Sequence, residues 1–202
     1  RGYRFLVFPT HSVAEEVATY ETLVREGQVD GFVLSNTNLD DARVEHLMAA
    51  NFPFVAFGRS NPRWDFPSVD VDGTFGVRRA VQHLHERGHR RIGVLAWPEE
   101  SLTGRYRLQG YAEEMAAANL PLCPDWVRRT ENRYSDAYDT ARALLQMGEG
   151  ERPSALIAMS DLMGIGAMNA AWDLGLEPGR DVAVVGFDDS SVTRFVRPAL
   201  SS

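Results

Sequence analysis

Short apolar runs alternate with amphipathic segments along almost the whole chain, and this alternation limits the folds that the sequence can adopt. The runs at 54–57, 92–96 and 155–159 have the length and the flanking turn residues of buried strands. The segment 77–88 carries apolar residues at i, i+3, i+4 and i+7 and ends at Gly88, as an amphipathic helix does. Strands that alternate with helices of about 10 to 15 residues predict βαβ units, and therefore parallel sheets covered by helices.

The alternation is interrupted once, by the irregular segment 59–67, which contains two prolines and has no helical or strand period. Two series separated in this way predict two α/β lobes. The predicted strands are 3–8, 31–34, 54–57, 68–72, 92–96, 126–130, 155–159 and 182–187. The predicted helices are 12–27, 41–51, 77–88, 108–119, 135–147 and 161–174, the first of which opens with a capping box formed by Ser12 and Glu15.

Charge and cysteine content restrict what this part of the protein can do. The net charge of the chain is −7. Because binding to duplex DNA depends on Lys and Arg that neutralise phosphates, we do not expect this part of the protein to contact DNA. Cys123 is the only cysteine, which precludes a disulfide within the chain and favours a reducing cytoplasm. No signal peptide is visible, and no apolar run is long enough to span a membrane. Because the sequence enters an apolar run without an initiator Met, we expect it to be part of a longer protein.

Polar side chains follow several of the predicted strands directly. In parallel sheets, ligands bind at the carboxyl ends of the strands, where loops lead into helices. The residues at these ends are Arg59 after 54–57, Thr103, Arg105 and Arg107 in a long loop after 92–96, Ser160 and Asp161 after 155–159, and Asp188, Asp189 and Ser190 after 182–187. Such groups can bind a hydroxylated ligand through charge-assisted hydrogen bonds.

Each of these residues also has a purely structural explanation. Asp161 can be the N-cap of the helix that follows it, and Asp188 and Asp189 can be turn residues. Arg105 and Arg107 can lie on a solvated helix face. Their common placement at one edge of the predicted sheet favours the ligand-binding interpretation.

Four ordered motifs resemble those of the LacI/GalR family of bacterial transcription regulators. They are Ser68-Val69-Asp70-Val71-Asp72 with the later Gly88-His89-Arg90-Arg91-Ile92, Arg107-Leu108-Gln109-Gly110-Tyr111, Ser160-Asp161-Leu162-Met163 with Gly166-Ala167, and Val184-Val185-Gly186-Phe187-Asp188-Asp189. The resemblance runs over essentially all 202 residues. It implies an α/β, two-lobed periplasmic-binding-protein-like type I fold with parallel sheets flanked by helices. Residues 1–71 would form part of the N-terminal lobe, 72–195 the C-terminal lobe, and 196–202 the start of a return to the N-terminal lobe.

The resemblance also implies a function. LacI/GalR regulators hold a small effector between their lobes, form homodimers and bind operator DNA through a separate helix-turn-helix headpiece. We therefore expect the effector-binding and dimerisation core of a cytoplasmic, ligand-responsive regulator, with a sugar or sugar derivative as effector. The family pattern places further strands and helices of the first lobe before Arg1 and after Ser202. The first lobe is accordingly expected to be incomplete, with apolar surfaces uncovered.

Effector contacts of the family carry over onto several positions of this sequence. Arg107 matches an arginine that commonly hydrogen-bonds the ligand, and Asp188 matches a carboxylate that accepts from ligand hydroxyls. Thr103 matches a position that carries a small side chain with a hydroxyl group in the family. Ser160 stands where Asn is usual, and its shorter side chain has one donor fewer, which weakens the prediction of a direct contact. Asp161 beside it is a further candidate.

Two more effector contacts follow from the resemblance. Tyr134 matches an aromatic platform, but the spacing is shorter than in the family, so Asn132 is an alternative. Arg59 matches a subset of members that carry Gly-Arg after the third strand.

Two other classes of function fit the sequence less well. A periplasmic sugar-binding protein of a transport system shares the fold, but it would carry an export signal and would not need the motif at 88–92. Gly164-Ile165-Gly166 is similar to part of a dinucleotide-binding motif, but the first glycine of such a motif follows the strand directly, whereas Asp161 already begins a helix here. No Ser/His/Asp or Cys/His arrangement and no metal-ligand spacing is recognisable. We therefore expect no catalysis, no metal and no cofactor.

Overall fold

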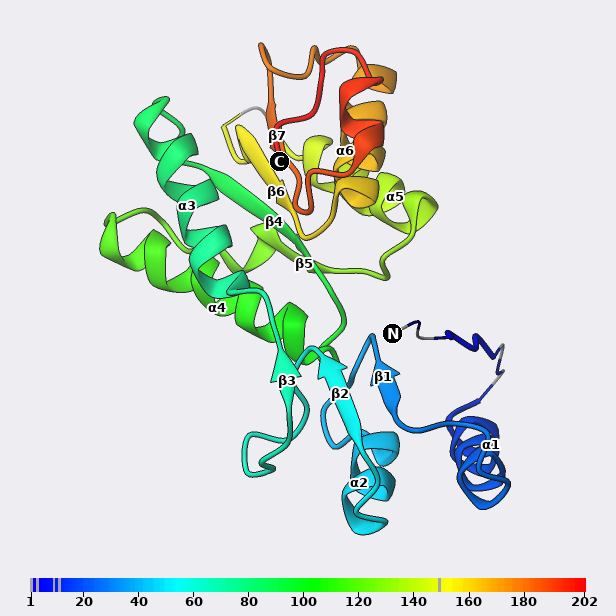
Figure 1. The fold of residues 1–202 in the computed structure, drawn as a ribbon. Coiled ribbons are helices and arrows are strands. Elements are labelled where there is room, and N and C mark those ends of the chain that lie inside the picture. The colour runs from blue at the N-terminus through cyan, green and yellow to red at the C-terminus, as the bar shows by residue number, and fades with distance from the viewer. Residues whose placement is uncertain (1, 3, 9, 11, 149) are drawn as a thin grey trace. The chain divides into compact units, whose positions relative to one another are not determined.

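A computed structural model describes residues 2, 4–8, 10, 12–148 and 150–202. The chain divides into two compact units, Arg1–Val71 and Asp72–Ser202, and each is described by itself (Figure 1). Each unit contains a parallel sheet with helices packed on it, which confirms the predicted α/β class. Among the described residues, no helix has both the length and the apolar character needed to cross a membrane.

The first unit contains a three-stranded parallel sheet in the order β1-β2-β3. Its elements are α1 (Val13–Arg25), β1 (Phe32–Leu34), α2 (Ala42–Ala49), β2 (Phe54–Phe57) and β3 (Ser68–Val69). Both helices begin at a side-chain cap, since Ser12 accepts the backbone N–H of Glu15 and Asp41 accepts that of Arg43. The N-cap predicted at Ser12 is thereby confirmed.

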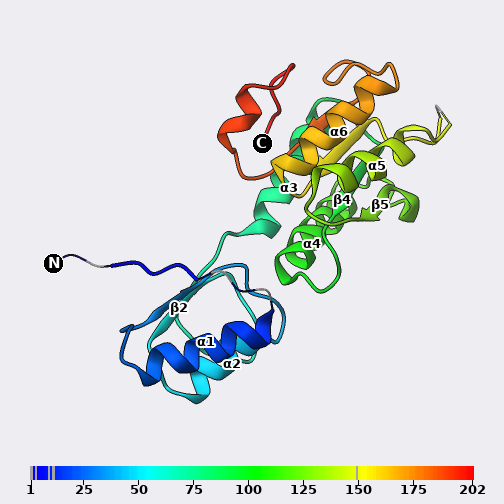
Figure 2. The same cartoon turned by 90° about the vertical axis from the view of Figure 1, so that its right-hand side faces the viewer.

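Both helices of the first unit pack on one face of its sheet (Figure 2). The residues buried between them and the sheet are Tyr20, Leu34, Val44, Leu47 and Ala56. Successive strand residues point to opposite faces, so Val33, Phe57 and Val69 point away from the helices. These three side chains are 69%, 54% and 62% exposed, so the second face of the sheet carries uncovered apolar groups.

The strand predicted at 3–8 is wrong for the residues that the structure describes. Tyr3 lies outside the described residues, and 4–8 belongs to no strand. Phe5 and Val7 are 82% and 90% exposed. A strand forms when a neighbouring strand satisfies its backbone N–H and C=O groups, and none of the described strands pairs with 4–8.

The second unit is built on a four-stranded parallel sheet in the order β5-β4-β6-β7. Its strands are β4 (Ile92–Ala96), β5 (Val127–Arg129), β6 (Ala155–Ala158) and β7 (Ala183–Val185). Its helices are α3 (Gly73–Glu86), α4 (Leu102–Ala117), α5 (Tyr134–Leu145) and α6 (Asp161–Asp173), with short 3-10 helices η1 (Pro124–Trp126) and η2 (Ser191–Arg194). Helices α3 and α4 pack together on one face of the sheet, and α5 and α6 pack together on the other (Figure 1).

The two central strands of this sheet, β4 and β6, are buried along their whole length. Near-continuous apolar runs are expected of parallel strands covered on both faces. Tyr111 and Met115 of α4 and Met163 of α6 are completely or almost completely buried against them. The hydroxyl of Tyr111 donates to the carbonyl of Ile92 at 2.8 Å, so this core has a satisfied polar group at its centre.

Residues 196–202 lie with the second unit. Leu200 is 7% exposed and belongs to the core of that unit, and Ser201 forms a parallel bridge with Val185. In this structure the segment that was expected to start a return to the N-terminal lobe is thus packed against β7.

Several element boundaries differ from the prediction: α3 begins at Gly73 rather than near Val77, β3 ends at Val69 rather than at Asp72, and two further differences, in α4 and β7, concern the candidate site. Helix α4 begins at Leu102 rather than near Leu108, because the hydroxyl of Ser101 accepts the backbone N–H of Gly104 at 3.1 Å. The long loop predicted after β4 is therefore largely helical. Strand β7 ends at Val185, which leaves Phe187 in the loop that follows.

Candidate functional site

The predicted residues of the second unit gather beyond the carboxyl ends of β4, β6 and β7, with Arg107 at their centre. Arg107 lies on α4 and is only 6% exposed, so it does not belong to a solvated helix face. Its Nη1 donates to the carbonyl of Met159, directly after β6. Its Nη2 lies 3.6 Å from Oδ1 of Asp188, which follows β7. The structure therefore brings together the arginine and the carboxylate that the sequence analysis singled out.

Two aromatic rings enclose the guanidinium of Arg107. Its Cζ lies 3.7 Å from the ring centroid of Phe187 and 4.7 Å from that of Trp97. Both are within the range of a cation–π interaction, which fixes the plane of the guanidinium without consuming its N–H donors. The indole N–H of Trp97 donates to the sulfur of Met163 at 3.1 Å and so orients one of the two rings.

Glycines in the first turn of α3 make room for this arrangement. A Cβ on Gly73 would lie 2.9 Å from Cγ of Arg107, and a Cβ on Gly76 would lie 2.7 Å from Cε2 of Phe187. Both distances are shorter than ordinary contacts, so the helix can pack this closely only because these positions lack side chains. The start of the second unit, at Gly73, is thus in direct contact with Arg107.

Asp188 has the character of a ligand-binding carboxylate. Its φ is +113°, a backbone conformation that few residues other than glycine adopt, and the chain bends there. Its side chain is 50% exposed. Burial raises the pKa of Asp188 above its ordinary value, the positive charge of Arg107 opposes this rise, and the charge of Asp161 adds to it. A carboxylate with one cation at 3.6 Å and half of its surface exposed can accept hydrogen bonds from the hydroxyls of a ligand.

Ser160 and Asp161 have different roles at the start of α6, since one caps the helix and the other bonds to a loop. The N-cap is Ser160, whose Oγ accepts the N–H of Met163 at 3.3 Å and donates to Oδ1 of Asn132 at 2.6 Å. Asp161 is therefore not the N-cap that its position suggested. It is 2% exposed, and its Oδ2 accepts from the backbone N–H and the hydroxyl of Ser190 at 2.6 and 2.7 Å. Through these bonds Asp161 holds the loop that carries Asp188.

Thr103 lies near the start of α4, and Tyr134 is the first residue of α5. Thr103 is half-buried in the first turn of α4, one helical turn before Arg107. The hydroxyl of Tyr134 accepts from Nδ2 of Asn169 at 2.8 Å, and its ring stacks on Tyr138. Asn132, the alternative to Tyr134, bonds directly to Ser160. Of these two positions, Asn132 is the one in contact with a residue of the cluster around Arg107.

In the first unit, Arg59 lies directly beyond β2. Its Nε is 3.2 Å from Oδ2 of Asp70, which follows β3, the neighbouring strand of the sheet. The Arg59 side chain is 60% exposed, whereas that of Asp70 is 17% exposed. The first unit therefore also presents an arginine and a carboxylate at the carboxyl ends of adjacent parallel strands.

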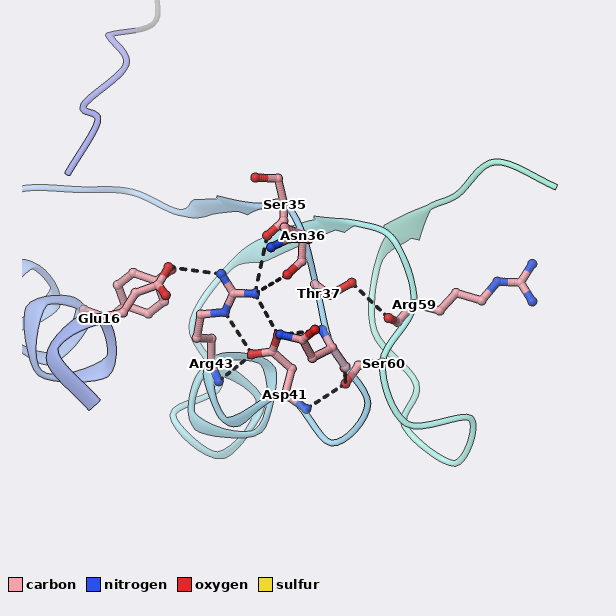
Figure 3. Close-up of polar contacts among 10 residues, drawn as sticks. Glu16, Ser35, Asn36, Thr37, Asp41, Arg43, Arg59 and Ser60 are labelled. Atoms are coloured by element: carbon pink, nitrogen blue, oxygen red, sulfur yellow. Dashed lines mark hydrogen bonds and ion pairs between the residues drawn. The ribbon is translucent and has the colours of Figure 1, made fainter. Parts of the chain in front are cut away.

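The backbone at Arg59 is tied to a buried polar network. The hydroxyl of Thr37 donates to the carbonyl of Arg59 at 2.9 Å, and the neighbouring Ser60 bonds to the segment after β1 (Figure 3). At the centre of this network, Arg43 and Asp41 form a bidentate ion pair. The sequence analysis assigned no role to Thr37, Asp41, Arg43 or Ser60.

The sequence analysis also missed the aromatic partners of Arg107. Phe187 was assigned to the strand 182–187, and no contact of Phe187 or Trp97 with Arg107 was predicted. The available signal was Gly186, since a glycine before an aromatic residue at a strand end is typical of a chain that turns there. Within the part of the chain that the structure describes, no group of His, Cys, Asp and Glu is arranged to hold a metal ion.

The chain is similar to known regulators in sequence and in fold. Residues 81–202 match the periplasmic binding protein-like domain family. A regulatory protein of the LacI family from Chloroflexus aggregans is 47% identical, with a TM-score of 0.91 over 96% of this chain and 69% of that chain. The transcriptional regulator CelR in complex with cellobiose is 34% identical, with a TM-score of 0.83 over 92% of this chain and 57% of that chain.

Among curated proteins, the HTH-type transcriptional repressor CytR of Escherichia coli K12 is 30% identical over 100% of this chain and 58% of its own length. The chain thus spans less than two thirds of this relative. The proteins named here are transcription regulators rather than enzymes or transport proteins. By its sequence and by its periplasmic-binding-protein-like fold, the chain belongs to the LacI family of regulatory proteins.

Proposed function

We propose that this chain is the effector-binding core of a ligand-responsive transcription regulator, and that its effector is a sugar or sugar derivative. The observation that supports this most directly is the cluster of Arg107 and Asp188 beyond the strand ends of the second unit. A fixed guanidinium next to a half-exposed carboxylate offers both donors and acceptors to vicinal hydroxyl groups. The aromatic ring of Trp97 adds an apolar surface beside them.

In this proposal the two units are the two lobes of the sensor, and Arg59 is the effector contact of the first lobe. Thr103, Ser160, Asp161 and Tyr134 complete the candidate set of the second lobe. Asp161 acts there through the loop of Asp188, because its carboxylate is engaged by Ser190. A ligand that contacts both lobes favours one orientation over the other, and such coupling typically amounts to about 1–3 kcal/mol.

We also propose that the whole protein is a cytoplasmic homodimer that binds operator DNA through a separate headpiece. The names of the relatives, which are HTH-type regulators, support this part of the proposal. The net charge of −7 supports a division of labour in which these residues sense the ligand and other residues bind DNA.

Calorimetric titration tests the site. Cellobiose, the sugar bound by CelR, is the first probe, followed by mono- and disaccharides, nucleosides and amino acids. We expect Arg107→Ala and Asp188→Ala each to lower the affinity for the sugar by at least about tenfold, because each removes a charged hydrogen-bonding partner of the ligand. Arg79→Ala, which alters an exposed arginine of α3 that is not among the candidate contacts, is the matched control. Tight binding of a nucleoside or amino acid would refute the sugar class. Unchanged affinity in both variants would refute the site.

A further inference from the structure

Arg43 is the point at which three segments of the first unit meet (Figure 3). It is 9% exposed, and its Nε and Nη2 donate to the two carboxylate oxygens of Asp41 at 2.9 and 2.7 Å. Its Nη1 donates to Glu16 of α1 at 3.1 Å. Its Nη2 also donates to the carbonyl of Asn36, in the segment directly after β1, at 3.0 Å. The guanidinium therefore fixes α1, the start of α2 and the chain between β1 and α2 relative to one another.

Asp41 extends this network toward the loop after β2. Its carboxylate accepts the backbone N–H of Asn38 at 3.0 Å, and its own N–H donates to the hydroxyl of Ser60 at 3.0 Å. That hydroxyl donates in turn to the carbonyl of Asn38 at 2.8 Å. Ser60 is 1% exposed, so these bonds are protected from water and rigid. The segment after β1 and the segment after β2 are thus joined.

The last connection ends on Arg59 itself. Thr37, which is 8% exposed, donates to the carbonyl of Arg59 at 2.9 Å. The preceding residue, Gly58, has a φ of +115°, and a Cβ there would lie 2.6 Å from the hydroxyl oxygen of Thr37. In Figure 3 the carbonyl of Arg59 points into the network while its guanidinium points away from it. The backbone is held on one side so that the side chain projects on the other.

We infer that Thr37 and Ser60, supported by Asp41 and Arg43, are positioning residues for Arg59. They do not contact the effector. They set the direction in which the Arg59 side chain projects from the sheet. They also limit the conformations of Arg59, so that less conformational entropy is lost when a ligand binds. The inference rests on the proposed function, because it takes Arg59 as the effector contact of the first unit.

The test isolates one hydroxyl group. Thr37→Ala and Thr37→Ser both remove the methyl group, but only Thr37→Ala removes the bond to the Arg59 carbonyl. Thr19→Ala and Thr19→Ser are the matched control, because the hydroxyl of Thr19 donates at 2.8 Å to the carbonyl of Glu15 within its own helix, α1, and not to the carbonyl of Arg59.

The first measurement needs no ligand. The backbone N–H of Gly58 donates to the carbonyl of Val69 at 2.9 Å, so its hydrogen-exchange rate reports opening of the chain next to Arg59. We expect Thr37→Ala to accelerate exchange at Gly58 by about three- to tenfold, which is the worth of one ordinary hydrogen bond. Thr37→Ser and the Thr19 pair should leave it unchanged. Equal exchange at Gly58 in Thr37→Ala and Thr37→Ser overturns the inference.

The second measurement asks whether Thr37 acts through Arg59. We expect Thr37→Ala to weaken cellobiose binding by about threefold to tenfold, but by less than twofold when Arg59 is already Ala. A purely structural role of Thr37 would weaken binding equally in both backgrounds and would contradict the inference. If the unaltered chain and Arg59→Ala bind cellobiose equally, Arg59 is not a contact for this sugar and the proposed function loses that residue. The exchange rate at Gly58 still decides whether Thr37 holds the chain.

Discussion

Among the residues that the structure describes, each unit has one buried arginine, Arg43 in the first and Arg107 in the second, and the two are held by different kinds of partner. Arg43 in the first unit has two carboxylate partners, at 2.7 and 3.1 Å. Arg107 in the second unit lies between two aromatic rings and has its carboxylate, Asp188, at 3.6 Å. Asp41 is 3% exposed, whereas Asp188 is 50% exposed.

We propose that this difference separates a structural arginine, Arg43, from a ligand-binding arginine, Arg107. A buried cation whose charge is matched by close, buried carboxylates has no electrostatic reason to attract a ligand. A cation held by π-systems keeps its affinity for an anionic or hydroxylated group, and a half-exposed carboxylate beside it can exchange water for ligand. Burial of an arginine alone therefore does not identify a site, and the exposure of its acidic partner is the more informative quantity.

The largest expected effect is on stability. Arg43→Met leaves Asp41 and Glu16 without their cation, and removal of one member of a buried ion pair typically costs about 3–5 kcal/mol. In Arg107→Met the new side chain still packs between the rings of Phe187 and Trp97, and water can solvate the carboxylate of Asp188. We therefore expect the free energy of unfolding to fall by only about 1–2 kcal/mol. Urea denaturation measures both, with the exposed Arg25→Met as control. Equal losses for Arg43 and Arg107 would remove the distinction between them.

A smaller effect is expected at the glycine that packs on Asp161. A Cβ on Gly186 would overlap the carboxylate and approach Cα of Asp161 to 3.3 Å. We expect Gly186→Ala to cost about 1–3 kcal/mol and to weaken effector binding, because Asp161 holds the loop of Asp188. Gly150→Ala is the control, since a Cβ there meets nothing within 4 Å. Intact stability and binding in Gly186→Ala would show that the loop does not depend on this contact.

The helix caps of the two units provide a third comparison. Ser160 is 3% exposed and serves both Met163 and Asn132, whereas Ser12 is exposed and caps α1 alone. Loss of an N-cap costs about 0.5–2 kcal/mol, so we expect Ser160→Ala near the upper end and Ser12→Ala near the lower end. Thermal or urea unfolding of the two variants measures this order, and a reversed order would contradict it.

The smallest expected effect is a difference in pH dependence. Burial opposes the ionisation of Asp41, but hydrogen bonds from Arg43 and Asn38 hold its pKa below the ordinary value. Its contribution to stability is therefore present above about pH 3.9, the ordinary pKa of Asp, and is lost as the pH falls through the lowered pKa. The pKa of Asp188 is raised, mainly by burial, so its contribution is present below the ordinary pKa and is lost as the pH rises through the raised one.

Urea denaturation between about pH 3 and pH 7 tests these opposite signs. As the pH rises, we expect the free energy of unfolding of Asp188→Asn to increase slightly relative to that of the unaltered chain. Over the same range, we expect that of Asp41→Asn to decrease relative to the unaltered chain. Parallel curves for the two variants would show that both carboxylates are in equivalent environments.

Much of the fold follows from local sequence patterns, because strand runs, helix periods and caps are local properties. The cap at Ser12 and the buried runs of β4 and β6 were predicted for this reason. The proximity of Arg107 and Asp188 was also predictable, because parallel strands bring their carboxyl ends to one edge.

The Arg43 network was not predictable, and the reason is physical. Arg43 stands in a short polar stretch of α2 and looks like any solvated helix residue, since its partners Glu16 and Asn36 come from other segments of the chain. The aromatic enclosure of Arg107 was missed for a similar reason. Phe187 follows the end of β7 and packs against the core as well as against the guanidinium of Arg107, which comes from α4, a distant segment of the chain.

The complete burial of β4 and β6 has a consequence for how such a sensor can diversify. Every residue of these strands is enclosed, while the candidate ligand contacts begin one residue or more beyond their ends. A change in an exposed side chain beyond these ends leaves the apolar area that β4 and β6 remove from water unchanged. The sheet can therefore keep its contribution to the free energy of folding while the residues beyond its strand ends vary, so that one architecture can carry different sites.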